Sequence, residues 1–456
     1  MTEVQRLAAF VERSTYEDLT DEALEQLRIR VLDSLGCAIG ALDGEPVRMI
    51  REHLDDFGGA RRCGLIGGGL TAPDRAALYN AALVRYLDYN DSYLAPGETC
   101  HPSDNLAAVL AATEYAGGSG RDLLTALAIS YQVQCRLSDE APVRAKGFDH
   151  TTQGVYGAAA GVSRALGLDA VRTAHAVAIA GTAFNALRVT RTGALSHWKG
   201  LAAPNAAFAG LHAAFLAMRG ITGPAEVFEG NKGFREAIAG PFEIEWDQEG
   251  LDRVTRTILK RYNAEIHSQS TLEGALELRG RHSIDPAAIE LVEVETFDVA
   301  YDIIGGGEEG DKTVVRTKEE ADHSLNYMLA VALLDGQVLP AQYEPVRIVR
   351  DDVQSLLRRV VVRPRADFSA RFPAEMPCQV AIHMHDGTVH TIEKRDYEGF
   401  HTRPMRWETV AAKFDGLALL RAGETLRGEI HQVVRTLEDR PVADVMTLLA
   451  RIGQGT

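Results

Sequence analysis

The fold is constrained most by a change in sequence pattern near residue 285. Before this point, Ala-rich segments with apolar residues three or four positions apart recur and are separated by Gly. This periodicity is typical of packed amphipathic helices. Helices are predicted at residues 21–42, 103–115, 120–136, 154–166, 169–180 and 201–218. Because many of them carry Ala on more than one face, we expect a large bundle whose helices pack closely on several sides.

After residue 285 the pattern becomes typical of β-strands. The segment 289–297 is rich in β-branched residues and partly alternates, which predicts a strand. A second strand is expected at 360–364, and Asp386-Gly387 between two further apolar runs predicts a hairpin with a type I′ turn. The strands of this hairpin are expected at 378–385 and 388–394, and helices at 321–335, 351–359, 407–414 and 417–435.

Together these patterns predict a mainly α protein with an inserted α+β domain. The large all-helical bundle domain is expected to comprise residues 1–268 and 400–456, because helical periodicity returns after Gly399. The smaller α+β domain is expected to comprise residues 269–399. A chain of 456 residues is long enough for both domains to bury cores without disulfides or metals.

The charge and the cysteines limit the function. The net charge of −16 excludes a global basic field for nucleic acid or anionic membranes, so an anionic ligand must be held by local positive groups. The five scattered cysteines form no C-x-x-C pair, which is typical of reduced thiols and gives no signal for an iron-sulfur cluster. We find neither a signal-peptide pattern nor a run of 18 apolar residues, and expect a cytoplasmic protein with no membrane or nucleic-acid partner.

Chemistry-bearing residues gather in five polar segments of the predicted loops and helix ends. In the first segment, Asp91 precedes His101 by ten residues, and a loop of this length can place a carboxylate beside an imidazole. Ser103 or Asp104 would cap the next helix, whose N-terminal N–H groups suit a substrate carboxylate. The alternative is that Asp91 and His101 only cap helices.

The second and third segments add a histidine and a group of basic side chains. His150 lies in a polar loop before an Ala-rich helix, where a structural role is the alternative. Residues 188–200 carry Arg188, Arg191, His197 and Lys199, which would suit a carboxylate-rich ligand in an otherwise acidic protein. A solvated surface turn is the alternative for this segment.

The last two segments lie in or beside the predicted α+β domain. Lys260 and His267 belong to a polar stretch at the join between the two predicted domains, where ligand sites are common. His323 and Tyr327 are four residues apart and are expected to share one helix face. His383 and His385 lie on one side of the predicted hairpin, but without a third ligand at suitable spacing they indicate a half-exposed strand face, so no metal site is predicted.

Six of these strings, in order along the chain, resemble the MmgE/PrpD family. They are Arg85–Ser92, His101–Asn105, Gly147–His150, Ser196–Gly200, Tyr262–Gln269 and Ala321–Tyr327. The resemblance implies a large helical domain with a smaller, lid-like α+β domain. It also implies a homodimer that works without metal or organic cofactor.

The resemblance further implies an enzyme that acts on a small polycarboxylate. The strings His101–Asn105, Gly147–His150 and Ala264–Gln269 are most similar to the 2-methylcitrate dehydratase branch. We therefore expect a hydro-lyase of propionate catabolism that converts 2-methylcitrate to 2-methylaconitate. The alternatives are a cis-aconitate decarboxylase, an iminodisuccinate epimerase and a non-catalytic polycarboxylate-binding protein. The decarboxylase branch has Thr four residues after the position of Asp91, where this chain has Ala95.

Matching the family's positions to this sequence gives an expected set of site residues. The catalytic candidates are Asp91, His101, His150, Lys199, Lys260 and Tyr327, and the substrate-binding candidates are Arg191, His267 and His323. The two lysines are expected to neutralise a substrate carboxylate while His101 or His150 removes the adjacent proton. Tyr327 or a protonated histidine would supply a proton to the leaving hydroxyl.

Overall fold

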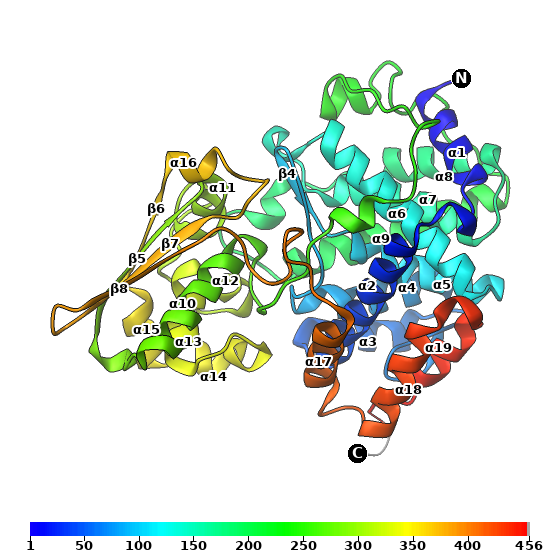
Figure 1. Ribbon diagram of the computed structural model, residues 1–456. Coiled ribbons are helices and arrows are strands. Elements are labelled where there is room, and N and C mark those ends of the chain that lie inside the picture. Colours follow the sequence, from blue (N-terminus) through cyan, green and yellow to red (C-terminus); the bar gives the residue numbers. More distant parts are fainter. Residues whose placement is uncertain (454–456) are drawn as a thin grey trace. The chain divides into compact units, whose positions relative to one another are not determined.

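The computed structural model describes residues 1–453 and divides the chain into two compact units (Figure 1). The helical unit consists of Met1–Thr190, Gly200–Thr257 and the chain from Arg406 onward. The α+β unit consists of Arg191–Lys199 and Ile258–Met405. Helices dominate the first unit and a small mixed sheet lies in the second, so the predicted fold class is confirmed.

The helical unit contains twelve α-helices within the described residues. They are α1 (Glu3–Arg13), α2 (Asp21–Gly40), α3 (Glu45–Phe57), α4 (Pro73–Tyr86), α5 (Leu106–Ala116), α6 (Gly120–Glu140), α7 (Thr151–Ala165), α8 (Ala170–Ala183), α9 (Trp198–Met218), α17 (Trp407–Ala418), α18 (Glu424–Arg435) and α19 (Val442–Leu449). Two short hairpins interrupt them, β1 (Cys63–Gly64) with β2 (Leu70–Thr71), and β3 (Tyr93–Ala95) with β4 (Glu98–Cys100). The first two residues of α9 belong to the α+β unit.

Small residues allow the central helices of the helical unit to pack closely. Helices α6 and α7 lie against each other, and a Cβ atom on Gly161 of α7 would lie 1.9 Å from Ser130 Oγ and 2.6 Å from the backbone oxygen of Ala126. The Ala-rich pattern of the sequence therefore has a direct packing consequence, because larger side chains would separate these helices.

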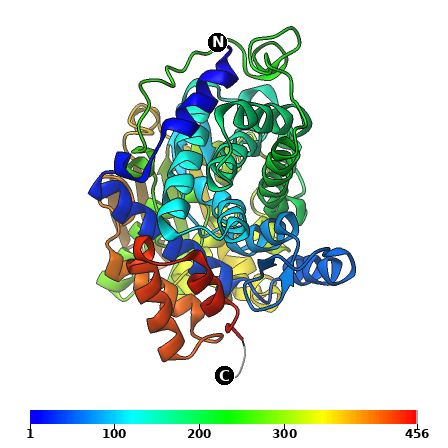
Figure 2. The same ribbon diagram turned by 90° about the vertical axis from the view of Figure 1, so that its right-hand side faces the viewer.

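The C-terminal helices belong to the helical unit because α17 and α18 pack on α2. Figure 2 shows these orange-to-red helices at the end of the unit that lies opposite to the N-terminal helix α1. The contact includes a buried ion pair in which Lys413 Nζ lies 2.7 Å from Asp33 Oδ1. The same ammonium donates to the backbone oxygen of Tyr89 at 2.8 Å, so the tail helps to hold the loop that precedes β3.

The α+β unit is built on a four-stranded sheet of order β6-β5-β7-β8. Strand β5 (Ile289–Thr296) is parallel to β6 (Val360–Pro364) and antiparallel to β7 (Cys378–Met384), which pairs with β8 (Val389–Lys394). Its helices are α10 (Gln269–His282), α11 (Asp298–Ala300), α12 (Lys318–Ala321), α13 (Leu325–Asp335), α14 (Pro345–Ile348), α15 (Asp351–Leu357) and α16 (Ala366–Ser369).

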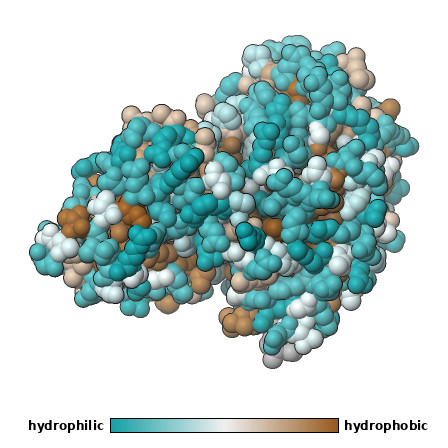
Figure 3. All heavy atoms as spheres, viewed as in Figure 1, coloured by the Kyte–Doolittle hydropathy of each residue, from teal (hydrophilic) through white to brown (hydrophobic). Residues whose placement is uncertain are grey.

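The two faces of this sheet differ in polarity. Val292, Val294, Val380 and Ile382 are buried in one hydrophobic core with residues of α10 and α13. The opposite face carries charged side chains, and there His383 Nε2 lies 2.8 Å from Glu293 Oε2. His383 therefore forms an ion-pair contact on a half-exposed strand face, as expected from its position in the sequence. In the view of Figure 3 the surface of each unit is mostly hydrophilic, with scattered apolar residues.

Three local predictions were wrong. The hairpin between β7 and β8 exists, but Gly387 has φ 85° while Asp386 does not have a positive φ, so the turn is not type I′. The predicted helix 321–335 is broken because the Ser324 side chain accepts the Tyr327 N–H and begins α13. The predicted helix 417–435 is divided between α17 and α18, and Gly423 precedes the second.

The unit boundaries differ from the predicted 269–399. Residues 258–268 lie in the α+β unit because backbone hydrogen bonds attach them to it. Leu259 N–H donates to Gly399 O at 3.0 Å, and Asn263 N–H donates to Val338 O at the same distance. Such long-range bonds leave no periodic signal in the sequence.

Helix α9 is long and apolar enough to cross a membrane by length and composition alone, with a mean hydropathy of 1.4 over its most apolar window. However, 56% of that window is buried within the protein. A buried core helix passes the same test, so the helix is weak support for a membrane span.

The packing of α6 against α7 makes Gly161→Ala a test of the fold. We expect a loss of about 1–3 kcal/mol in the free energy of unfolding, because the new methyl group would meet backbone and hydroxyl oxygens at less than contact distance. Urea denaturation followed by circular dichroism measures this loss. Gly154→Ala in the same helix is the control, since its Cβ would lie 3.4 Å from Gln134 Nε2, and unchanged or slightly increased stability is expected.

Candidate active site

In the helical unit, the predicted site residues lie on the loop between α4 and α5 and at the start of α7. The loop turns sharply at Asp88, a non-glycine residue with φ 53°. Arg85 forms a buried ion pair with the Asp88 carboxylate. Asn90 Nδ2 donates to Ser103 Oγ and to Asp104 Oδ1, each at 2.9 Å. These interactions compensate for the unfavourable backbone conformation and fix the loop that carries Asp91 and His101.

The Asp91 carboxylate holds its surroundings together from a fully buried position. Its Oδ1 accepts the Ser103 N–H at 3.1 Å and the Ser103 hydroxyl at 2.6 Å, and its Oδ2 accepts the Tyr131 hydroxyl at 2.7 Å. Burial raises the pKa of Asp91, whereas these hydrogen bonds oppose the increase. The predicted role for Ser103 was wrong: α5 begins at Leu106, and the Ser103 hydroxyl bonds to Asp91 instead of capping the helix.

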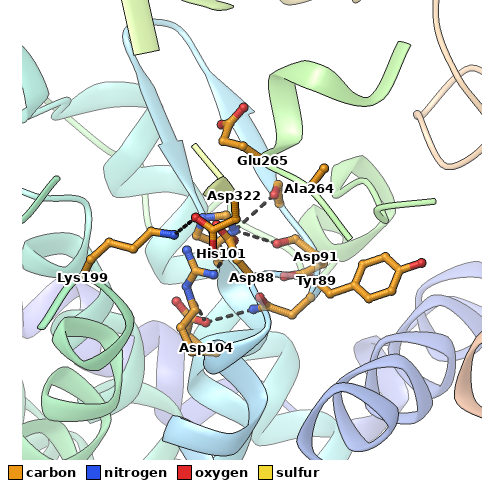
Figure 4. Close-up of polar contacts among 12 residues, drawn as sticks. Asp88, Tyr89, Asp91, His101, Asp104, Lys199, Ala264, Glu265 and Asp322 are labelled. Atoms are coloured by element: carbon orange, nitrogen blue, oxygen red, sulfur yellow. Dashed lines mark hydrogen bonds and ion pairs between the residues drawn. The ribbon is translucent and has the colours of Figure 1, made fainter. Parts of the chain in front are cut away.

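His101 contacts the backbone of Asp91, not its carboxylate. Its Nδ1 lies 2.7 Å from the Asp91 carbonyl oxygen and 3.1 Å from Ser92 Oγ (Figure 4). A carbonyl oxygen only accepts hydrogen bonds, so in the neutral ring we assign the proton to Nδ1 and the lone pair to Nε2. The expectation of an Asp91 carboxylate beside the imidazole was therefore wrong, although the loop does select one tautomer.

His150 places a second imidazole beside the first. It directly precedes α7, and its ring lies edge-on to that of His101 with 5.2 Å between centroids. Its Nδ1 lies 3.5 Å from the buried Asp149 Oδ1, and the Asp149 N–H donates to Ala186 O at 2.9 Å. The helical unit thus presents two buried histidines in contact, an arrangement suited to proton transfer.

In the α+β unit, one carboxylate gathers three potentially cationic groups. Asp322 Oδ1 accepts from Lys199 Nζ at 2.8 Å (Figure 4). The same oxygen lies 2.7 Å from His323 Nδ1, and Oδ2 accepts from Lys318 Nζ at 2.7 Å. Burial alone would raise the pKa of Asp322, but the charges of Lys199 and Lys318 outweigh it and lower the pKa. Lys199 is 2% exposed, so its ammonium is held in a fixed position.

A second carboxylate in this unit pairs with His267. Glu265 Oε1 lies 2.7 Å from His267 Nδ1, and Oε2 accepts the His267 backbone N–H at 2.7 Å. Burial opposes ionisation of Glu265, but the charge and hydrogen bond of His267, with contributions from His323 and Lys260, lower its pKa to about 2. Lys260 itself has no exposed surface.

Tyr327 lies in the hydrophobic core of the α+β unit. Its side chain is fully buried, and its hydroxyl donates to the backbone oxygen of Gln342. His323 precedes the Ser324 cap and is outside α13, so the prediction that His323 and Tyr327 share one helix face was wrong. Arg191, the remaining substrate-binding candidate, is buried at the end of the short 3₁₀ helix Arg188–Arg191.

Sequence reasoning did not select the two carboxylates or Lys318. Asp322 directly precedes His323, and Glu265 precedes His267 by two residues. An acidic residue next to a predicted site histidine was the available signal. Lys318 lies four residues before Asp322 on α12, which is the spacing of a helical ion pair.

Two family models match this chain. The MmgE/PrpD N-terminal domain matches residues 5–247, and the MmgE/PrpD C-terminal domain matches residues 262–439. The chain belongs to the MmgE/PrpD family. In this MmgE/PrpD protein, the second match extends beyond the α+β unit through α17 and α18, which pack in the helical unit.

Relatives of this MmgE/PrpD protein include enzymes of two activities. The cis-aconitate decarboxylase of Mus musculus is 26% identical over 95% of this chain and 90% of its own length. The 2-methylcitrate dehydratase of Escherichia coli is 27% identical over 72% of this chain and 71% of its own length. The mitochondrial 2-methylcitrate dehydratase of Yarrowia lipolytica is 25% identical, with coverages of 94% and 86%.

Asp322→Asn tests whether this carboxylate stabilises the α+β unit. We expect a loss of about 3–5 kcal/mol in unfolding free energy at pH 7, because Lys199, Lys318 and His323 would lose their shared partner. Since folding lowers the pKa of Asp322 below 3.8, its contribution is fully present above about pH 4 and decreases as pH falls further.

Urea denaturation at pH 7, 5 and 3.5 measures this difference. The deficit of the variant should be constant from pH 7 to pH 5 and smaller at pH 3.5. Glu319→Gln, on the same short helix, is the control and should leave stability within about 0.5 kcal/mol of the wild type. An Asp322→Asn variant as stable as this control would contradict the assigned role.

Proposed function

We propose that this MmgE/PrpD protein is a hydro-lyase that dehydrates 2-methylcitrate to 2-methylaconitate in propionate catabolism. The observation that carries the proposal is the contact between the His101 and His150 rings, buried in the helical unit. The buried lysines of the α+β unit support it, because a tricarboxylate needs local cations in a protein of net charge −16.

The dehydration requires removal of a proton from the carbon next to a carboxylate. Charge then builds up on a group that is already anionic, so a fixed cation is needed where that charge develops. Lys199 and Lys260 are our candidates for this role. The ammonium of Lys199 is positioned by Asp322, which limits the reorganisation that its interaction with substrate would need.

The base is one of the two contacting histidines. His101 offers Nε2 as its lone-pair nitrogen, because Nδ1 donates to the Asp91 carbonyl. His150 is the second candidate, with its ring positioned at the start of α7 and Asp149 nearby. Asp91 acts indirectly in this proposal, by holding Ser103 and Tyr131 around the His101 loop.

Decarboxylation of cis-aconitate is the second candidate function. It is supported by the Mus musculus relative, whose alignment covers more of this chain than that of the Escherichia coli dehydratase. Two sequence features favour dehydration instead. They are Ala95, where the decarboxylase branch has Thr, and the dehydratase-like string Ala264–Gln269.

We further propose that the protein is cytoplasmic and forms a homodimer. Light scattering of the purified protein would test the homodimer.

The reaction is identified by offering 2-methylcitrate, cis-aconitate and iminodisuccinate separately and following each by proton NMR. The assay is run after exhaustive chelation, because the proposal requires no metal. We expect an olefinic product from 2-methylcitrate alone. Carbon dioxide release from cis-aconitate would instead establish the second candidate. Activity that returns only with added iron or zinc would contradict cofactor independence.

Variants of the two units test the site assignment. His150→Ala and Lys199→Ala are each expected to lower kcat/KM by at least about a hundredfold, since one removes a proton-transfer group and the other a charge-stabilising group. His212→Ala, at an exposed position on α9, should retain wild-type activity. Circular dichroism establishes that each variant is folded. Near-normal turnover by either site variant would exclude it from the site.

A further inference from the structure

We propose that His267 is the proton donor to the leaving hydroxyl and that Glu265 is its positioning residue. This inference deepens the proposed function and rests on it. The elimination needs a proton donor as well as a base. Tyr327, one candidate for this role, directs its hydroxyl to the Gln342 carbonyl within the core of the α+β unit. The pair of Glu265 and His267 offers an alternative in the same unit.

The geometry of the pair fixes one orientation of the imidazole. Glu265 accepts the His267 backbone N–H through one carboxylate oxygen and contacts Nδ1 through the other, both at 2.7 Å. The ring therefore cannot turn without breaking a charge-assisted hydrogen bond. Because an ionised carboxylate only accepts, Nδ1 carries a proton and Nε2 is left to exchange its proton with another group.

Two aromatic rings contact His267. Its ring contacts those of Phe297 and Phe372, each at 5.7 Å between centroids, and these two phenylalanines stack on each other at 4.3 Å. His267 is 1% exposed, and its Nε2 makes no hydrogen bond within the described residues 1–453. A buried nitrogen without a partner costs about 1–3 kcal/mol, which a hydrogen bond to a bound substrate would recover.

Several charged groups act on this pair. Lys260, His323 and Lys312 all act electrostatically on Glu265 or on the groups around it. The pKa of Glu265 is lowered to about 2, which keeps the carboxylate ionised beside the imidazole ring. Removing this carboxylate charge should therefore weaken the hydrogen bond that holds the Nδ1 proton of His267.

In the proposed step the base takes one proton from the substrate and His267 gives one to the leaving oxygen. The base removes the proton from the carbon next to the carboxylate, and the C–H electron pair forms the C=C bond as the C–O bond breaks. The leaving oxygen takes the proton of His267 Nε2 and departs as water. His267 becomes neutral, with Nδ1–H still directed at Glu265. The base then loses one proton to solvent and His267 gains one, which restores the enzyme.

The first test needs no substrate. Histidine-¹⁵N-labelled full-length protein is studied by NMR, with His267→Gln used to assign the ring signals. In the wild type we expect a proton on Nδ1 that exchanges slowly with water, and in Glu265→Gln an exchange at least tenfold faster. A wild-type ring without a proton on Nδ1, or exchange unchanged in Glu265→Gln, would overturn the pair. Glu293→Gln is the matched control, since it alters a half-exposed carboxylate that pairs with His383 and Arg363 on the sheet.

The second test measures dehydration of 2-methylcitrate across pH. His267→Gln should lower kcat at least a hundredfold with KM within about threefold, as expected when only proton donation is lost. In Glu265→Gln the basic limb of the kcat profile should move to lower pH, and Glu265→Asp should restore part of the shift. An unchanged profile, or near-normal kcat in His267→Gln, would overturn the assignment. If no acid in the substrate panel reacts, the proposed function fails, whereas the NMR result still decides the pair.

Discussion

The α+β unit depends on buried carboxylates that hold positive groups in fixed places. Lys199 and Lys260 are almost completely removed from water, and an isolated ammonium in that position would lose its proton or destabilise the fold. Asp322 supplies the opposite charge for Lys199, Lys318 and His323, and Glu265 does so for His267. The cost of burying these charges is offset only because the hydrogen bonds are short and shared.

The helical unit follows a different principle, since His101 bonds to a backbone carbonyl and a hydroxyl. His101 is oriented by the Asp91 carbonyl, and the Asp91 carboxylate is used to hold Ser103 and Tyr131. His150 has a longer contact with a carboxylate, because its Nδ1 lies 3.5 Å from Asp149 Oδ1. A base that must give up its proton in each cycle is favoured by such moderate stabilisation.

Membership of the MmgE/PrpD family supports an enzyme but does not identify a single reaction. Dehydration and decarboxylation both require carboxylate recognition and proton transfer, and relatives of both activities are about equally similar to this chain. The difference between the reactions depends on where the proton donor meets the substrate. For this reason the His267 pair, together with Ala95, is more informative about the reaction than the lysines that both reactions would need.

The sequence by itself determined the fold class, the family and the strands β5, β6, β7 and β8, because periodicity and turn residues are local properties. It also predicted a set of ionisable site residues, which stays a prediction. Only the tertiary structure decided their partners: the Asp91 carboxylate bonds to Ser103 instead of His101, and Tyr327 lies in a core. Asp322 joins Lys199, 123 residues away in the chain. Hydrogen bonds and ion pairs between distant segments depend on how the elements pack, and no spacing rule in the sequence encodes that packing.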